Sequence, residues 1–286
     1  MEDRKIAILV DSGTDVPGDF IREHNIFVAP LKIIFSDGEY DDRVNITPKE
    51  VYDRLEQEIP KTSLPDPGYV HGLFERIKEQ GYGTVLVITI SSNLSGTHNL
   101  LRVAAQEHPE LDVHMVDTKN IGIGAGLQAM LAARLVREGA PLEDILAKLR
   151  ESIKESRIYF CLDTLEYLAK GGRIGKVSAL LGSVLHLVPV ISCNPDGIYE
   201  TVAKVRGNAH AVARAVSLVV AHAARHARFA VAVAYGSAQA EAMKVLAELR
   251  QLLPRCEQFI QTDVSPALGV HTGPGLIGIA IQALPA

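Results

Sequence analysis

Residues 84–97 have the sequence TVLVITISSNLSGT, and this stretch decides the fold class. Its first half, residues 84–90, is a continuous apolar run, which is typical of a strand in a parallel sheet covered on both faces. Its second half, residues 91–97, is polar and leads into a predicted helix. Ligands of open α/β sheets bind beside the carboxyl ends of the strands. The stretch therefore predicts a buried parallel strand and a candidate ligand-binding loop.

Strands and helices alternate through the first half of the chain. Apolar runs predict further strands, and polar segments between them predict the starts of helices; the strands are at residues 5–10, 26–34 and 113–117, and the helices begin near residues 15, 47, 97 and 121. Asp15 is expected to cap the first of these helices, which has Pro17 in its first turn. This alternation predicts a doubly wound, mainly parallel α/β domain, which we expect to span residues 1–155.

The second half of the chain has a different order of elements. A strong hairpin signal, Asp196-Gly197, joins two apolar runs at residues 188–192 and 198–205. Helices and strands then follow in turn, at residues 208–226, 229–234, 239–252, 258–262 and 276–283. This order predicts a C-terminal α+β domain, residues 156–286, with a mixed or antiparallel sheet backed by helices.

Composition excludes several classes of function. The 286 residues are 47% hydrophobic and carry a formal net charge of -5, which argues against a general affinity for nucleic acid. The three cysteines lack metal-ligand spacing, so no metal site is expected and a reducing compartment is indicated. No apolar run reaches the roughly 18 residues of a membrane span, and no signal peptide is evident. We expect a cytoplasmic protein without stable membrane insertion.

Residues 162–175, LDTLEYLAKGGRIG, join the two predicted domains. Asp163 or Thr164 can cap a short helix, which the two glycines at 171 and 172 would end. Arg173 then lies at a sharp turn before residues 177–185, an apolar segment predicted to be a second helix. A cation at the mouth of an apolar helix suggests a ligand with an anionic head and an apolar body. The alternative is that the glycines only end the helix and Arg173 is a solvated surface residue.

Three polar loops, at residues 11–15, 62–68 and 91–97, are expected where ligands bind in open α/β sheets, outside the carboxyl ends of strands. In the third loop, Ser91, Ser92 and Ser95 place hydroxyl groups beside the backbone N–H groups of a helix start. A carboxylate or a phosphate would be stabilised there by these donors and by the helix dipole. The alternative is ordinary capping of the helix by one of the serines.

A nucleophilic serine in the same loop is a second functional interpretation, that of an esterase or acyltransferase. Serine chemistry needs a base within hydrogen-bond reach, for which His98 and His271 are available, and Asp11 or Asp117 would orient the base. The chain lacks the Gly-x-Ser-x-Gly pattern, which disfavours a hydrolase.

Residues 201–240 contain no acidic side chain but several basic ones. This segment is either an amphipathic surface helix with its neighbours or a docking face for an acidic partner.

Taken together, these segments make the chain similar to the DegV family, which includes the fatty-acid-binding subunit of bacterial fatty acid kinase. The resemblance covers essentially the whole chain and rests on six separate blocks in the same order. These are residues 10–17, 62–65, 90–97, 163–174, 204–207 and 271–275. Asp66 departs from the family's pattern, in which a small hydroxyl residue is common at this position.

The resemblance implies a two-domain binding protein, without a cofactor or catalytic residues of its own, that encloses one long-chain fatty acid. A separate ATP-dependent kinase would phosphorylate the carboxylate to an acyl phosphate while the lipid stays on the carrier. Carried onto this sequence, the carboxylate ligands are Thr62 and either Ser92 or Ser95, with Arg173 and His271 close by. The acyl chain is expected among residues 177–187 and 122–133.

Overall fold

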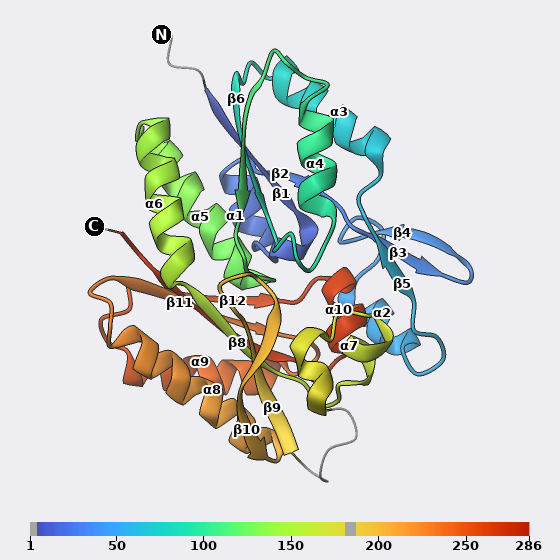
Figure 1. Ribbon diagram of the computed structural model, residues 1–286, viewed down its shortest axis with the longest axis vertical. Helices are drawn as coiled ribbons and strands as arrows, with labels where there is room; N and C mark the ends of the chain where they lie inside the picture. The colour runs from blue at the N-terminus through green and yellow to red at the C-terminus, as the bar shows by residue number, and fades with distance from the viewer. Residues whose placement is uncertain (1–4, 181–186, 286) are drawn as a thin grey trace.

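A four-stranded parallel sheet forms the centre of the first half of the chain in the computed structural model, which describes residues 5–180 and 187–285 (Figure 1). Its strand order is β2-β1-β6-β7, with β1 at Ile6–Asp11, β2 at Phe27–Ala29, β6 at Thr84–Thr89 and β7 at Asp112–Asp117. Every residue of β6 is buried. The prediction of a parallel strand covered on both faces is therefore confirmed.

Helices cover both faces of this sheet. On one face, Leu9 and Val87 pack with α3 (Pro67–Glu79) and α4 (Thr97–Ala105). On the other face, Ile8 and Ile88 belong to the cluster that contains α5 (Ile123–Arg137). The short helix α1 (Gly18–Glu23) follows β1. Asp15 does not cap α1, whose first residue follows Pro17, so that expectation was wrong.

The second half of the chain forms a separate six-stranded mixed sheet. Its strand order is β10-β9-β8-β13-β11-β12, with bounds β8 Arg157–Cys161, β9 Leu187–Cys193, β10 Tyr199–Arg206, β11 Phe229–Tyr235, β12 Gln258–Asp263 and β13 Ile277–Ala283. Neighbouring strands are antiparallel except β11 and β12. The predicted hairpin is present, because β9 and β10 pair from Cys193 and Tyr199 outward. Helices α8 (Asn208–Ala223) and α9 (Gln239–Leu252) cover one face.

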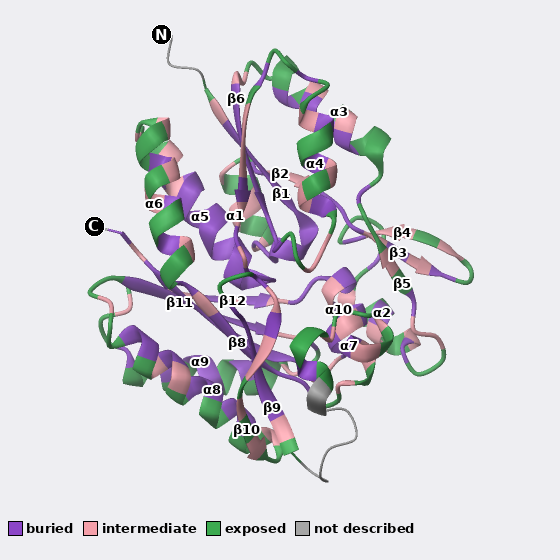
Figure 2. Cartoon of the chain, in the orientation of Figure 1, coloured by how far each residue is buried: buried purple, intermediate pink, exposed green. Residues whose placement is uncertain are grey.

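Helix α5 lies between the two sheets (Figure 1, Figure 2). It contacts β1 and β6 of the parallel sheet and β11 and β13 of the mixed sheet. Residues 123–133 are all buried, as expected for a helix that is apolar on every side. Small residues permit this close packing: a Cβ at Gly126 would lie 2.3 Å from the Thr14 carbonyl oxygen. The sheets share one apolar cluster, and the domain boundary after residue 155 stays a prediction.

A third, small antiparallel sheet was not predicted. Its strand order is β4-β3-β5, with β3 at Lys32–Phe35, β4 at Gly38–Asp41 and β5 at Lys61–Ser63. The predicted strand at 26–34 is two strands in two different sheets, because Pro30 interrupts the run and lacks a backbone N–H. Helices α2 (Pro48–Arg54) and α10 (Pro266–Thr272) pack against this sheet. Helix α10, from near the end of the chain, thus covers a small sheet whose strands come from the first half of the chain.

The segment 162–175 contains the short helix α7, Glu166–Lys170, as predicted. The N-cap residue is Leu165 rather than Asp163 or Thr164, so that expectation was wrong, although Thr164 Oγ1 accepts a hydrogen bond from the N–H of Glu166 at 3.1 Å. The next element, η2 at Gly175–Leu180, is a 3₁₀ helix rather than the start of a long α-helix. Residues 181–185 of the predicted second helix lie outside the described residues. Within the described ranges, we find no helix both long and apolar enough to cross a bilayer.

Candidate functional site

A cavity of about 220 Å³ lies where the three sheets meet. One water molecule needs only about 10–15 Å³, so the cavity has room for a much larger ligand. Most of its wall is apolar and comes from both halves of the chain, including Leu31, Ile90, Ile123, Phe160, Leu268 and Leu276. Such a space fits a ligand with a sizeable hydrocarbon part.

Four of the five predicted site residues line this one cavity. They are Thr62 on β5, Ser95 in the loop before α4, Arg173 after α7, and His271 on α10. Two come from the first half of the chain and two from the second. The fifth, Ser92, is not among the lining residues; its hydroxyl donates to Asp117 Oδ2 at 2.5 Å.

Thr62 and His271 form the closest polar pair of the site. Thr62 Oγ1 lies 2.7 Å from His271 Nε2. Burial lowers the pKa of His271 to about 4, and the positive charge of Arg173 acts in the same direction. The imidazole is therefore neutral at pH 7. In its Nε2–H tautomer it donates to Thr62 Oγ1, which leaves the threonine O–H free for a ligand.

The two glycines after α7 have different roles. Gly172 has φ +70°, a left-handed conformation that glycine adopts without steric cost. Gly171 is right-handed but lies against the imidazole: a Cβ there would be 2.0 Å from His271 Nδ1. Its carbonyl oxygen accepts a hydrogen bond from Arg173 Nη1 at 2.8 Å. The turn therefore holds the guanidinium beside the histidine, and Gly171 is required for close approach.

The serines in the loop after β6 have different hydrogen-bond partners. Ser91 is buried, and its Oγ accepts from the N–H of Asn93 at 3.2 Å. Ser95 Oγ lies 2.8 Å from Thr97 Oγ1 and accepts from the N–H of Thr97 at 3.2 Å. Ser95 is partly exposed and lines the cavity. Of the two serines predicted together, it is the one placed to meet a ligand in this cavity.

The geometry gives no support to a serine nucleophile. Among the described residues, no serine hydroxyl is hydrogen-bonded to a histidine. His98 Nδ1 pairs with Thr89 Oγ1 at 2.9 Å, and Ser92 is bound to the carboxylate of Asp117. A hydroxyl that donates to a carboxylate and has no imidazole partner is not activated in the way the triad requires.

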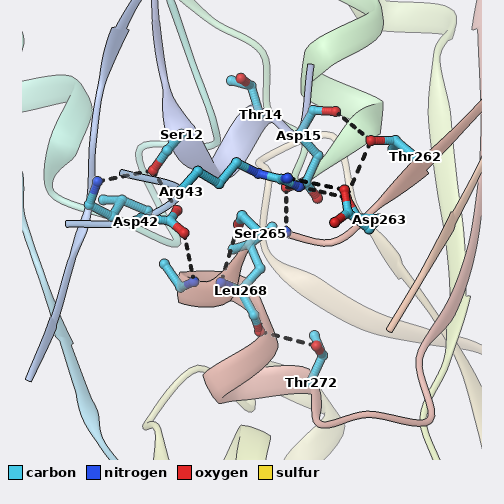
Figure 3. Close-up of polar contacts among 12 residues, drawn as sticks. Ser12, Thr14, Asp15, Asp42, Arg43, Thr262, Asp263, Ser265, Leu268 and Thr272 are labelled. Carbon is cyan, nitrogen blue, oxygen red and sulfur yellow. Dashed lines mark hydrogen bonds and ion pairs between the residues drawn. The ribbon is translucent and has the colours of Figure 1, made fainter. Parts of the chain in front are cut away.

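A network of acidic side chains and their partners reaches the cavity wall, and Figure 3 shows its polar contacts. Asp15 lines the cavity wall, and its Oδ1 accepts the N–H of Ser265 at 2.8 Å. Arg43 lies 3.7 Å from the same oxygen and 3.0 Å from Asp263 Oδ1. Burial is the main cause that raises the pKa of Asp15 to about 7. Asp15 therefore holds the start of α10 instead of capping α1.

A second carboxylate of the network also contacts α10. Asp42 accepts from Ser12 Oγ at 2.6 Å and from the N–H of Ala267 at 3.2 Å. Burial raises the pKa of Asp42 to about 6. These contacts fix the helix that carries His271. Sequence reasoning singled out the loop at residues 11–15, but it missed Asp42 because its partners are far away in the sequence.

Asp66, the departure from the family's pattern, has a local structural role. Its side chain accepts the N–H of Tyr69 at 2.8 Å and caps α3. It is not among the residues that line the cavity.

Comparison with known proteins identifies the family. The sequence profile of the DegV family, described as a family of uncharacterised proteins, matches residues 5–284. The chain belongs to the DegV family. A DegV domain-containing protein of Clostridium acetobutylicum is 38% identical over 277 residues, which are 97% of this chain and 98% of the relative.

Solved DegV structures share the fold. A DegV family protein from Thermus thermophilus, described as fatty acid binding, has a TM-score of 0.89 at 31% identity and covers 98% of this chain and 100% of its own. A stearic acid-binding protein from Eubacterium ventriosum has a TM-score of 0.89 at 26% identity, over 97% of this chain and 98% of its own.

Proposed function

We propose that this DegV protein binds one long-chain fatty acid, with the carboxylate at Thr62, Ser95, His271 and Arg173 and the acyl chain in the cavity. One observation carries the proposal: four polar side chains from both halves of the chain line a cavity that is otherwise largely apolar. The fatty acids named for similar solved structures support it.

The acyl chain supplies most of the binding free energy. Burial of a methylene group is worth roughly 0.8 kcal/mol, so a sixteen-carbon chain contributes about 12 kcal/mol before entropy costs. Apolar side chains such as Ile123 and Phe160 replace the water around it.

The carboxylate requires compensation because loss of its water costs several kcal/mol. Arg173 offers a charged donor, and Thr62 and Ser95 offer hydroxyl donors. His271 stays neutral and, through its contact with Thr62, keeps that hydroxyl turned toward the ligand. The site thus holds a carboxylate without burying an unpaired charge.

The second part of the proposal is that the bound carboxylate is presented to an ATP-dependent kinase, which forms the acyl phosphate. Arg173 is exposed, and Thr62 and Ser95 are partly exposed, so the polar part of the site lies near the surface. A second protein has access to the carboxylate there while the acyl chain remains enclosed. The DegV protein itself acts as a carrier in this scheme.

Lipid extraction tests the binding step. The protein is purified from a bacterial host and denatured, and the extract is analysed by mass spectrometry, followed by binding assays with palmitate and oleate. We expect about one fatty acid per chain. Ser95→Ala should weaken binding, whereas Ser92→Ala, the matched control in the same loop, should not. Absence of fatty acid together with no binding of either added lipid would reject the proposal.

The kinase step has a separate test. Loaded protein is incubated with ATP and a fatty acid kinase, and acyl phosphate is measured. A fluorophosphonate probe is applied in parallel: a carrier stays unlabelled, whereas a serine esterase is labelled covalently at the loop of residues 91–95.

A further inference from the structure

Two histidines face each other in the outer layer of the parallel sheet. His71 lies on α3, and His108 lies in the turn between α4 and β7. His71 Nδ1 is 3.2 Å from His108 Nε2. His108 is buried and stacks on Phe74, with the ring centroids 5.1 Å apart. The core therefore holds the His108 ring in place.

Carboxylates lie beside the outer nitrogen of each ring. His71 Nε2 is 3.3 Å from Glu107 Oε2. His108 Nδ1 is 3.3 Å from Glu75 Oε1 and 3.8 Å from Glu110 Oε1. Because an ionised carboxylate only accepts hydrogen bonds, each outer nitrogen has an acceptor beside it when it carries the ring's proton.

One tautomer of each ring leaves two lone pairs facing each other. A neutral imidazole has one N–H: the two rings are hydrogen-bonded when either His71 Nδ1 or His108 Nε2 carries it, and both nitrogens are open to a cation when the outer nitrogens carry the protons. Two nitrogen lone pairs at 3.2 Å repel each other unless a cation lies between them. A metal ion is such a cation, and it would replace the hydrogen bond between the two rings.

We propose that His71 Nδ1 and His108 Nε2 bind a divalent transition-metal ion of the zinc type, with water completing its coordination. Imidazole nitrogen is a favoured ligand of zinc, copper and nickel. Zn–N bonds of about 2.0–2.1 Å in a tetrahedron place two ligand nitrogens about 3.3–3.4 Å apart. The separation here is 3.2 Å. Metal-bound histidines usually donate their second N–H to a carboxylate or a carbonyl, and both rings have a carboxylate there.

The surrounding charges also favour a divalent cation. Glu75, His108 and Glu110 offer ligand atoms within 4.8 Å of one another. Lys78 Nζ, however, lies 2.6 Å from Glu75 and 3.1 Å from Glu110, so its ammonium group already neutralises these two carboxylates in part. With Glu107, the three carboxylates exceed the one ammonium group by two negative charges. A divalent ion at the imidazole pair balances that excess.

The metal site is separate from the proposed fatty-acid site. Neither His71 nor His108 lines the cavity. The ion would instead link α3 to the turn before β7, and binding to the folded state alone would stabilise the protein. Failure of one proposal therefore leaves the other intact.

Zinc titration of the full chain, without a histidine tag and stripped with a chelator, tests the site. Zn²⁺ binding is measured by calorimetry and by competition with a fluorescent indicator, and the melting temperature is recorded with and without Zn²⁺. His71→Gln removes one ligand at a half-exposed position. His114→Gln is the matched control, because His114 pairs with Asp112 at 3.1 Å and has no imidazole partner in the described structure.

We expect one Zn²⁺ per chain in the unmodified protein and in His114→Gln, with a rise in melting temperature. His71→Gln should bind at least about tenfold more weakly and lose that rise. No binding at micromolar Zn²⁺ would mean that the two imidazoles share only a proton, and the proposal would be overturned. Equal binding by His71→Gln would place the ion elsewhere and would overturn it as well.

Discussion

Thr62 Oγ1 lies 2.7 Å from His271 Nε2, although 209 positions of the chain separate the two residues. The contact exists because α10, from the end of the chain, packs on the small sheet that contains β5. Asp15 and Asp42 hold the start of α10 through backbone N–H groups. The polar end of the cavity is thus assembled by buried carboxylates that do not themselves form the proposed carboxylate site.

The titration of His271 is the first prediction. Because burial and Arg173 lower its pKa to about 4, the imidazole of the lipid-free protein should remain neutral down to about that pH. A bound carboxylate nearby favours the imidazolium, so the pKa should rise on addition of palmitate. NMR of the His271 ring across the pH range measures both states. A lipid-free pKa near the usual 6.5 would contradict the burial of this group.

The same shift has a consequence for stability. The folded-state pKa of His271 lies below its unfolded value of 6.5. The contribution of the neutral His271 to the free energy of unfolding is therefore fully present above pH 6.5 and is lost as the pH falls toward 4. His271→Gln should make unfolding less sensitive to acid in this window, as measured by denaturant titration at several pH values. An unchanged pH profile would count against the neutral buried imidazole.

Alanine substitutions at Gly171 and Gly172 distinguish two roles of glycine. One role is close packing against His271, and the other is a left-handed backbone conformation. Gly171→Ala places a Cβ where it would lie 2.0 Å from His271 Nδ1, so the imidazole must move and fatty-acid binding should weaken. Gly172→Ala is the matched control: no atom lies within 4 Å of its added Cβ, and the left-handed φ costs about 1 kcal/mol of stability. Equal loss of lipid affinity in both variants would refute the role given to Gly171.

Arg173 should act on the ligand rather than on folding. It is exposed, and Arg173→Ala should weaken fatty-acid retention while the free energy of unfolding changes by less than about 1 kcal/mol. Arg206→Ala removes an exposed arginine that does not line the cavity and serves as the control. Retention assays on loaded protein measure the effect. If the two variants retain lipid equally, Arg173 has no part in holding the carboxylate.

Burial of Asp11 is expected to change the pH dependence of the free energy of unfolding in the opposite direction to His271. Burial raises the folded-state pKa of Asp11 to about 7, above its unfolded value of 3.8. The favourable contribution of Asp11 to the free energy of unfolding is fully present below pH 3.8 and is lost as the pH rises through 7. Asp11→Asn should therefore gain stability relative to the unmodified protein between pH 4 and pH 7.5, by roughly a few kcal/mol. A difference that stays constant across that range would show that Asp11 is ionised throughout.

Sequence patterns predicted those parts of the fold that depend on local signals. The apolar run at residues 84–90 and the Asp196-Gly197 hairpin are both present as expected. The run at residues 26–34 was misassigned to one strand, because Pro30 sends its two halves to different sheets. Local patterns do not show which sheet a short strand joins, since that choice depends on partners distant in the sequence.

In the candidate site, too, some features follow from the local sequence and others depend on partners distant in the sequence. Local sequence signals singled out Ser95, Arg173 and His271, the family resemblance added Thr62, and all four line one cavity. Ser92 and Ser95 are equivalent in sequence, and the difference between them is that Asp117, at the end of a neighbouring strand, binds Ser92. The network of Asp15, Arg43 and Ser265 carries no short motif, because its members meet only in the folded protein (Figure 3).

A crystal structure of the protein with bound palmitate tests directly whether Thr62, Ser95 and Arg173 hold the carboxylate. We predict that the carboxylate oxygens lie within hydrogen-bond distance of Thr62, Ser95 and Arg173 and that the hydrocarbon chain extends between Ile123 and Phe160. A lipid bound elsewhere, or one whose carboxylate points away from these residues, would contradict the account.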